Sequence, residues 1–230
     1  MRLKFFSIFY LVICTGLLGC IGESSLSSMV EDCNNGDLKS CLEYLRLHDQ
    51  KKISQEASNF DQILSQAAKL GNVDAMFNLA VRATQPQTSP LDIDLAIHWF
   101  SQASSAGDSL SSLNLGLIYD HGIGVKPDYI KARYWYKKAA DSGDPEGLFN
   151  LAVYLDKGLG GNIDKHAAAR AYMLASQRGH ARSAYNLALM LGRGEGIDKN
   201  WESAIKMLRY SYELGYEPAK QLLKKWSKIE

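Results

Sequence analysis

The sequence contains few prolines and little net charge, and both shortages narrow the possible classes of protein. Five of its 230 residues are proline, and valine-rich alternating stretches are almost absent, so β structure is not expected. Basic residues number 26 and acidic residues 25. Nucleic-acid binding requires a clustered excess of basic side chains, which this near-neutral chain lacks. The apolar share of 46% indicates a globular protein rather than a disordered one.

The N-terminal apolar run is short for a membrane span. Arg2 and Lys4 precede the run over 5–19, whereas a comfortable span needs about 20 residues. This arrangement is typical of a signal peptide. The run closes on Leu-Leu-Gly-Cys at 17–20, which resembles a bacterial lipobox, so Cys20 is expected to be the lipidated first residue of the mature protein. The alternative is an ordinary signal peptide with a chance cysteine.

The lipoprotein resemblance implies a membrane anchor for residues beyond the signal peptide at 1–19. Several acyl chains on Cys20 would hold the protein stably, because each buried methylene contributes about 0.8 kcal/mol. Ile21 follows where a retention signal would have aspartate, so the usual sorting rule implies the outer membrane, facing the periplasm. The serine-rich, polar stretch over 20–32 is expected to be a tether.

Four cysteines are present, and two remain once the export signal is removed. Cys14 lies inside the signal peptide and Cys20 is assigned to lipid. Cys33 and Cys41 then form an even pair in an oxidising compartment. An Asn-Gly dipeptide between them can turn the chain. A disulfide would link the two helices of the first hairpin and stabilise it by about 2–4 kcal/mol. Metal binding is the weaker alternative, because the nearest further ligand is His48.

Self-similarity is the strongest signal in the sequence. Glycine recurs every 36 residues without a slip, at Gly71, Gly107, Gly143, Gly179 and Gly215. Asn-Leu keeps the same interval, beginning at 78, 114, 150 and 186. A period of this size indicates a repeat architecture, in which each unit buries its apolar face only against its neighbours.

Each repeat is expected to contain two helices. Asp or Asn precedes each helix as an N-cap: Asn72, Asp108 and Asp144 for the first helix, and Asp92, Asp128, Asp164 and Asn200 for the second. Apolar residues at helical spacing, such as Ala132, Trp135, Tyr136 and Ala139, mark the second helix. The junction glycine would end it in a left-handed conformation. If the loop between the helices is freer, Gly122 should tolerate substitution better than the junction Gly143.

The segment NLGLIYDHGIGVKPDYIKARYWYKKAADSGD at 114–144 resembles the SEL-like repeat (SLR), a relative of the tetratricopeptide repeat. The resemblance covers residues 73–108, 109–144, 145–180 and 181–216, after a degenerate unit at 37–72 and before an expected capping helix at 217–230. It implies an all-α fold for 33–230: a right-handed α/α superhelical solenoid whose concave face binds partner proteins. The spacing of Cys33 and Cys41 also resembles the disulfide-bearing branch of this family.

By analogy with tetratricopeptide repeats, the first helix of each unit would line the concave groove. An apolar band is expected at Phe77, Leu113, Phe149 and Tyr185, with a second row at Val81, Leu117, Val153 and Leu189. The asparagines Asn78, Asn114, Asn150 and Asn186 would bond to a partner's backbone or to the neighbouring repeat. Acidic Asp120 and Asp156, with basic His121, Lys157, Arg182 and Arg193, would select the partner. The apolar band has core packing as its alternative.

Catalytic motifs occur only in incomplete form. Gly-Asp-Ser-Leu-Ser at 107–111 spells an esterase motif, but it coincides with a repeat junction and lacks the paired Asp and His. Ser203 and Lys206 match the Ser-x-x-Lys of penicillin-interacting enzymes without its companion motifs. The five histidines show no metal-ligand spacing, and the loop glycines recur as turns. We therefore expect no cofactor.

These observations predict a non-catalytic periplasmic protein-binding module. Its partner would be a protein, either an effector or an envelope component, and it would meet the membrane only through lipid. The SLR resemblance suggests an immunity protein that neutralises a type VI secreted phospholipase effector. The alternatives are an envelope assembly scaffold and a weak β-lactam-interacting enzyme of the disulfide-rich SLR branch.

Overall fold

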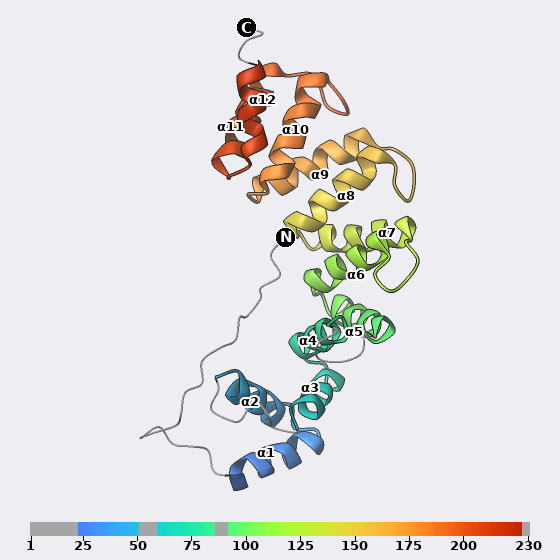
Figure 1. The fold of residues 1–230 in the computed structure, drawn as a ribbon, viewed down its shortest axis with the longest axis vertical. Coiled ribbons are helices and arrows are strands. Elements are labelled where there is room, and N and C mark those ends of the chain that lie inside the picture. The colour runs from blue at the N-terminus through green and yellow to red at the C-terminus, as the bar shows by residue number, and fades with distance from the viewer. Residues whose placement is uncertain (1–22, 51–58, 86–91, 227–230) are drawn as a thin grey trace. The chain divides into compact units, whose positions relative to one another are not determined.

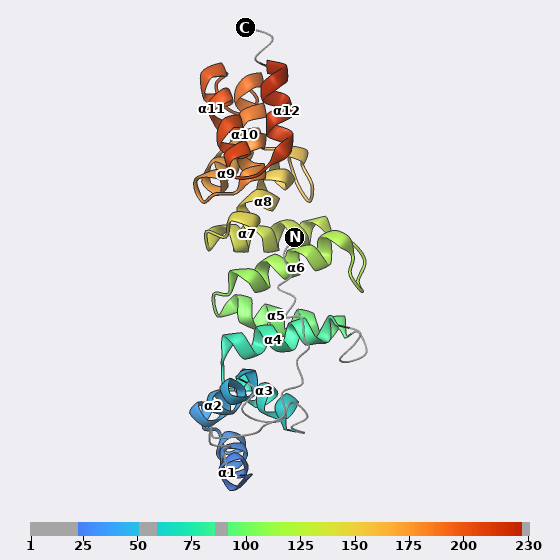
Figure 2. The same cartoon turned by 60° about the vertical axis from the view of Figure 1, so that its left-hand side comes forward.

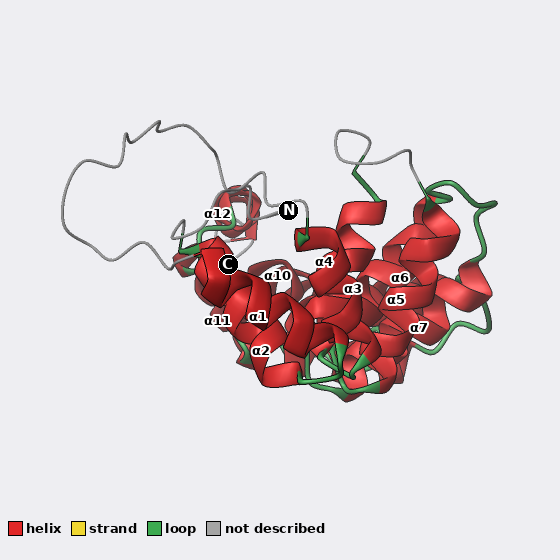
Figure 3. Cartoon of the chain, turned by 90° about the horizontal axis from the view of Figure 1, so that it is seen from below, coloured by secondary structure: helices red, strands yellow, loops and turns green. Residues whose placement is uncertain are grey.

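A computed structural model describes residues 23–50, 59–85 and 92–226 of the chain. Within these ranges the chain forms twelve helices and no strand (Figure 3). No helix there is long and apolar enough to cross a membrane. The predicted signal peptide and Cys20 lie outside the described residues. The chain divides into two compact units, Met1–Gln66 and Ala67–Glu230, which are described separately.

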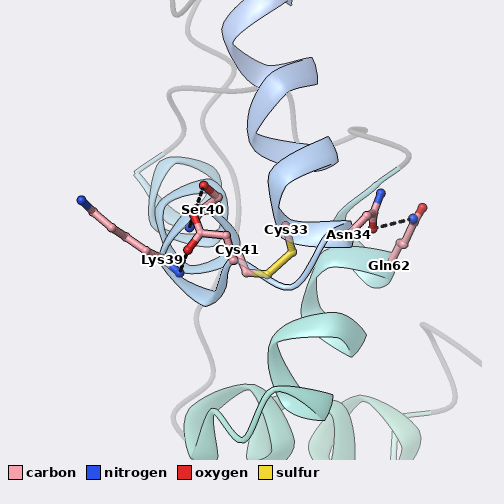
Figure 4. Close-up of a disulfide and its surroundings, with 7 residues drawn as sticks. Cys33, Asn34, Lys39, Ser40, Cys41 and Gln62 are labelled. Carbon is pink, nitrogen blue, oxygen red and sulfur yellow. Dashed lines mark hydrogen bonds between the residues drawn. A yellow bond between two sulfur atoms is a disulfide. The ribbon is translucent and has the colours of Figure 1, made fainter.

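The first unit is a disulfide-bonded helical hairpin followed by the start of a third helix. Helix α1 (Glu23–Asn34) packs against α2 (Leu38–Asp49), and α3 (Phe60–Lys69) begins before the boundary between the units. A disulfide joins Cys33 to Cys41, and both are fully buried (Figure 4). Gln62 of α3 donates to the Asn34 side chain at 3.0 Å. The predicted disulfide across the first hairpin is thus confirmed.

The predicted tether over 20–32 is wrong for its described part, because residues 23–32 belong to α1. Leu26, Met29, Val30 and Cys33 recur at i, i+3, i+4 and i+7, which gives one apolar face on a helix. The first three are half-buried and Cys33 is buried. Composition alone suggested a solvated linker, whereas the spacing of these few apolar residues decides the local structure.

The second unit contains four helix pairs and a final helix. The first helix of each pair, here called an A helix, is α4 (Val73–Ala83), α6 (Ser109–His121), α8 (Pro145–Lys157) or α10 (Ala181–Arg193). The second, or B helix, is α5 (Ile93–Ser105), α7 (Tyr129–Asp141), α9 (Lys165–Gln177) or α11 (Trp201–Glu213). Helix α12 (Glu217–Trp226) follows. Figures 1 and 2 show α4 to α12 stacked in chain order, each helix packing on the next.

The N-caps predicted from the sequence are confirmed. Asp108 accepts a hydrogen bond from the Ser111 backbone N–H at 2.7 Å, and Asp144 accepts from that of Gly147 at 2.7 Å. The predicted caps of the B helices make the same bond. Helix α10 is capped instead by His180, whose Nδ1 accepts from the Ser183 N–H at 3.2 Å. These bonds satisfy backbone donors that a helix leaves unpaired at its start.

The junction glycines end the B helices as predicted. All five have positive φ, for example 98° at Gly107. The Gly107 N–H donates to the Ser104 carbonyl at 3.1 Å and the Asp108 N–H to the Ala103 carbonyl at 3.0 Å. This pair of bonds defines a Schellman motif, in which a left-handed residue lets the chain satisfy the last carbonyls of the helix. The next A helix therefore starts in a fixed direction.

The loop between the two helices of a repeat is more constrained than the junction. A Cβ at Gly122 would lie 2.7 Å from Pro127 Cδ and 2.9 Å from the Val125 carbonyl oxygen. At Gly143 the nearest atom would be the Arg178 guanidinium, at 3.4 Å. The condition that the loop be freer than the junction is therefore not met, and Gly122 is not expected to tolerate substitution better than Gly143. The reason is that the loop folds back on itself, whereas the junction turns in open space.

Small residues allow the helices to approach closely. The four B-helix alanines at the shared position are fully buried: Ala96, Ala132, Ala168 and Ala204. On α6 a Cβ added to Gly116 would lie 2.5 Å from the Tyr136 ring of α7. The aromatic ring occupies the space that a larger residue on α6 would need. The core of the unit therefore runs between the A and B helices from one repeat to the next.

Candidate binding face of the A helices

The A helices present three rows of equivalent side chains that are exposed or half-buried. The asparagine row is Asn78, Asn114, Asn150 and Asn186, the aliphatic row is Val81, Leu117, Val153 and Leu189, and the last-turn row is His121, Lys157 and Arg193. Residues three, four or seven apart share one side of a helix. We call these rows together the A face. Helix α6 also contacts α8 directly, so the A face is continuous between these two repeats.

The asparagines have different partners in different repeats. Asn114 donates its Nδ2 to the Leu110 carbonyl of its own helix at 2.9 Å. Asn186 hydrogen bonds to the hydroxyl of Tyr172 on α9, whose pKa burial raises to about 12. Asn78 is exposed. Bonding to the neighbouring repeat thus occurs at Asn186, and partner binding by the row stays a prediction.

The apolar band that was expected to face outward packs inside the unit. Its members are Phe77, Leu113, Phe149 and Tyr185. Phe149 is only 4% exposed, and the ring of Phe77 lies edge-on to Phe100, with 5.7 Å between centroids. Tyr185 contacts Tyr216 in the same way at 5.2 Å, and Leu113 packs on a buried cluster. One residue along a helix is a turn of about 100°, so these aromatic and apolar side chains point into the core while the asparagines beside them are turned away by that angle.

Asp120 holds three helices together. From the end of α6 it accepts the Tyr136 hydroxyl of α7 at 3.0 Å and the Tyr154 hydroxyl of α8 at 2.6 Å. Both tyrosines are at most 3% exposed. Burial and the Asp120 carboxylate raise the pKa of both hydroxyls, so both stay protonated. This carboxylate, expected to select a partner, is instead engaged within the chain.

Asp156 is also engaged within the chain. Its carboxylate accepts from the Lys165 ammonium of α9, and Lys165 reaches Glu195 at 3.5 Å. The bond to Asp156 raises the Lys165 pKa. Glu195 in turn lies 3.8 Å from Arg193. A chain of alternating charges therefore crosses from α8 to the loop after α10, and neither predicted acidic residue is left as a simple surface charge.

The last-turn row gives the A face a positive edge. His121, Lys157 and Arg193 are exposed at equivalent positions of three successive A helices. Basic groups at a helix C-terminus interact favourably with the helix dipole, so the helices themselves tolerate this row. An acidic group of a partner protein would meet three basic side chains along one line.

The opposite end of α8 carries a compact polar cluster that the sequence motifs did not indicate. The His180 Nε2 lies 3.1 Å from the Glu146 carboxylate, and this hydrogen bond lowers the Glu146 pKa. The Arg182 guanidinium lies over the Phe149 ring at 4.4 Å. These contacts join α8 to α10. Glu146 and His180 are 34 residues apart, so their contact can be recognised only when the packing of one repeat on the next is known.

The two serines that resembled nucleophiles occupy ordinary helical positions. Ser109 begins α6, and the Ser203 N–H donates to its cap Asn200 at 2.8 Å. Ser203 also lines a shallow, largely apolar cavity of about 570 Å³ between α9, α10 and α11, with Met173, Leu187 and Met207. The Lys206 ammonium is bound by Glu202 at 2.6 Å. The Lys206 side chain is therefore engaged by Glu202.

Comparison with known proteins agrees with this architecture. A protective antigen of uropathogenic Escherichia coli strains with an SLR fold matches at a TM-score of 0.75 and 26% identity, over 86% of this chain and 43% of that one. A Sel1 repeat protein from Oxalobacter formigenes matches at a TM-score of 0.66 and 21% identity, over 87% and 80% of the two chains.

The chain thus spans less than half the length of the Escherichia coli protein. A search of curated proteins found no match. The Sel1 repeat family model matches residues 73–108, 109–144, 145–180 and 181–216, which are the units predicted from the 36-residue period. These matches cover more than half of the chain, and the chain belongs to the Sel1 repeat family.

Proposed function

We propose that this protein is a non-catalytic binding module that holds a partner protein on the A face. Sel1 repeats form protein-interaction modules. The observation that carries the proposal is the alignment of half-buried aliphatic side chains beside the exposed basic row at His121, Lys157 and Arg193. Apolar contact supplies affinity, and the charges at its edge select the partner and speed its association.

The chemistry of the A face favours a partner segment with apolar side chains and carboxylates. The half-buried side chains of Leu117, Val153 and Leu189 give shallow aliphatic contacts. Exposed amides such as that of Asn78 can both donate and accept hydrogen bonds. A strongly basic partner would be repelled by the basic side chains of the last-turn row.

We further propose that the protein acts in the bacterial envelope. The Leu-Leu-Gly-Cys sequence at 17–20 supports a lipid anchor, and the disulfide between Cys33 and Cys41 suits an oxidising compartment. An immunity role against a type VI secreted phospholipase effector is one form of this function, and an envelope scaffold is the other. A lipase gene beside this one, together with a secretion spike gene, would favour immunity.

The β-lactam-interacting enzyme is the weaker candidate. Lys206 is paired with Glu202, whose pKa this contact lowers, so the lysine is engaged by a carboxylate four residues away. A Ser-x-x-Lys enzyme needs its lysine directed at the serine. Ser203→Ala is therefore expected to leave function unchanged, and loss of a hydrolytic activity in this variant would revive the enzyme hypothesis.

The A face is tested by reversing its charges. The full-length chain is used to capture envelope proteins, and the captured protein is purified and titrated against wild type and against Lys157→Glu/Arg193→Glu. We expect at least a tenfold loss of affinity, equivalent to about 1.4 kcal/mol. Lys206→Glu/Arg209→Glu on α11 is the matched control and should bind normally. Equal binding by all three proteins would show that the A face is not the site.

A further inference from the structure

One repeat differs from the others on the outer side of its B helix. At the second residue of the B helices, α5, α9 and α11 have Asp94, His166 and Glu202, whereas α7 has Ile130. Four residues later they have His98, Arg170 and Lys206, whereas α7 has Tyr134. Two neighbouring positions that are polar or charged in every other repeat are therefore apolar or aromatic in this one.

These side chains are well exposed. Ile130 is 73% exposed and Tyr134 is 55% exposed. Ile163, in the loop that follows α8, is 62% exposed, and Lys199 occupies the same position one repeat later. We call Ile130, Tyr134 and Ile163 the α7 patch. Apolar residues clustered at one surface of a soluble protein indicate an interaction site more often than singly scattered ones do.

The loop that carries Ile163 is fixed against α7. Arg133 of α7 donates from Nη1 to the Asn162 carbonyl at 3.3 Å and to the Leu159 carbonyl at 3.5 Å. A Cβ at Gly160 would lie 2.2 Å from the Tyr129 carbonyl oxygen, so the loop backbone lies directly on the first turn of α7. The α7 patch is therefore a preformed surface, which lowers the entropic cost of binding.

Basic side chains lie near the α7 patch. Two of them form exposed ion pairs within the chain, Lys131 with Asp128 at 3.6 Å and Lys137 with Asp141 at 2.6 Å, and exposed pairs of this kind contribute little energy. Helix α7 has four basic residues, Lys131, Arg133, Lys137 and Lys138, and one acidic residue, Asp141. Helix α5 has one acidic residue, and its only basic residue is His98. Helix α11 has two acidic residues, one lysine and one arginine. The apolar substitutions thus occur on the most basic of the four B helices.

We propose that the α7 patch is a second docking surface, separate from the A face, for the acidic face of a partner protein. An apolar side chain of the partner would lie between Ile130, Tyr134 and Ile163, and carboxylates around it would meet Lys131 and Lys137. Aromatic and aliphatic anchors inside a charged rim are the usual composition of such surfaces.

Two other occupants fit less well. A symmetric dimer through the α7 patch would place one α7 against another, and their like charges would repel. A lipid bilayer would remove water from the polar loop residues Gly161 and Asn162, which are exposed next to Ile163, and its hydrocarbon core supplies no hydrogen-bond partners. A protein surface can supply them.

Site-specific crosslinking tests the proposal in cells. Tyr134 of the full-length chain is replaced by the photo-crosslinking residue p-benzoylphenylalanine, and the matched control carries it at Arg170, the equivalent position on α9. Mass spectrometry then identifies the crosslinked peptide. We expect a crosslink at 134 and none at 170, to a peptide of a different protein that contains several Asp or Glu residues.

The captured protein is then purified and titrated against wild type and against Ile130→Asp/Tyr134→His, which gives α7 the residues of α5 at these positions and so preserves the fold. We expect at least tenfold weaker binding of the variant, and weaker wild-type binding as salt is raised, because charges contribute. Unchanged affinity of the variant would overturn the proposal. A self-crosslink at 134 would assign the surface to a second copy instead.

A vesicle assay separates protein from lipid. Vesicles of three parts phosphatidylethanolamine to one part phosphatidylglycerol are sedimented with the chain bearing Cys20→Ala. Sedimentation that Ile130→Asp/Tyr134→His abolishes would assign the α7 patch to the membrane and overturn the proposal. Retention of the chain in the supernatant agrees with a protein partner. Charge reversal at Lys157 and Arg193 leaves the α7 patch intact, so the two surfaces are tested independently.

Discussion

Glycine meets two different needs in the repeats at 109–144, 145–180 and 181–216. At the junction it supplies a positive φ in open space, as at Gly107, where an added Cβ would have no atom within 4 Å. In the loop after the A helix it also permits contact with the preceding B helix. A Cβ at Gly160 would lie 2.2 Å from the Tyr129 carbonyl oxygen, and one at Gly196 would lie 2.2 Å from that of Lys165. The loop of one repeat thereby packs closely against the B helix of the repeat before it.

This difference predicts which of two glycine-to-alanine substitutions lowers the free energy of unfolding more. Gly107→Ala should lower the free energy of unfolding by about 1–2 kcal/mol, the cost of a left-handed alanine. Gly160→Ala carries the same strain and adds overpacking against backbone, roughly 1–3 kcal/mol more. Urea denaturation followed by circular dichroism measures both. Equal costs, or a larger cost at Gly107, would contradict the close approach of the loop to α7.

The tyrosine pair on Asp120 predicts a specific sensitivity to alkali. Burial and Asp120 raise the pKa of Tyr136 and Tyr154 above their value in the unfolded chain, which is about 10. Above that pH the unfolded chain releases protons that the folded chain keeps. The unfolded state then binds fewer protons, so the free energy of unfolding falls as pH rises.

Tyr154→Phe should weaken this pH dependence. At neutral pH the variant loses a hydrogen bond to a carboxylate, which costs about 1.5–3 kcal/mol. Between about pH 9 and 11, however, its free energy of unfolding should fall less steeply than that of wild type. Tyr134→Phe, at an exposed position, is the control and should keep the wild-type slope. Identical slopes in all three proteins would show that the Asp120 contacts do not act in solution.

At the scale of elements, the disulfide acts on one hairpin only. Cys33 and Cys41 join the end of α1 to the start of α2, and both belong to the first unit. Closing a loop of this length contributes roughly 2–3 kcal/mol in the chain-entropy model. Contacts in a solenoid join neighbours, so a local loss does not spread evenly along the chain.

Cys33→Ser/Cys41→Ser should therefore loosen α1 and α2 while leaving distant helices protected. Hydrogen exchange read by mass spectrometry gives this helix by helix. We expect faster exchange in 25–49 and unchanged exchange in α8 to α11. A uniform rise across all helices would mean that the chain unfolds as one cooperative block. Unchanged exchange in α1 and α2 would mean that the bridge contributes nothing to their stability.

The sequence was most informative where structure depends on nearby residues. The 36-residue period, the caps at Asp108 and Asp144 and the junction glycines follow from local backbone chemistry, and the structure agrees. Contacts between repeats could not be predicted from the sequence in the same way. The inward direction of Phe149 and the two tyrosines on Asp120 depend on which side of a helix its neighbours cover. Helix α1 has the serine-rich composition of a linker, and only the spacing of its few apolar residues indicates a helix.

In the molecule as a whole, the two proposed binding surfaces lie at different positions on the repeats. The A face and the α7 patch use different helices of the same unit, so a partner could occupy one while the other stays accessible. Both present basic side chains beside apolar ones. Neither surface requires the predicted N-terminal anchor, which lies outside the described residues. The predicted anchor would instead set which proteins the two surfaces can meet.

The predicted anchor can be tested at Cys20. The Leu-Leu-Gly-Cys sequence at 17–20 predicts that this cysteine is acylated, so palmitate supplied to growing cells should label the protein and place it in the membrane fraction. Cys20→Ala should abolish both, because without acyl chains the hydrophobic contribution to anchoring is lost. Cys14→Ala, within the same predicted signal, is the matched control and should remain labelled. Membrane retention of unlabelled Cys20→Ala protein would show that something other than lipid on Cys20 holds it there.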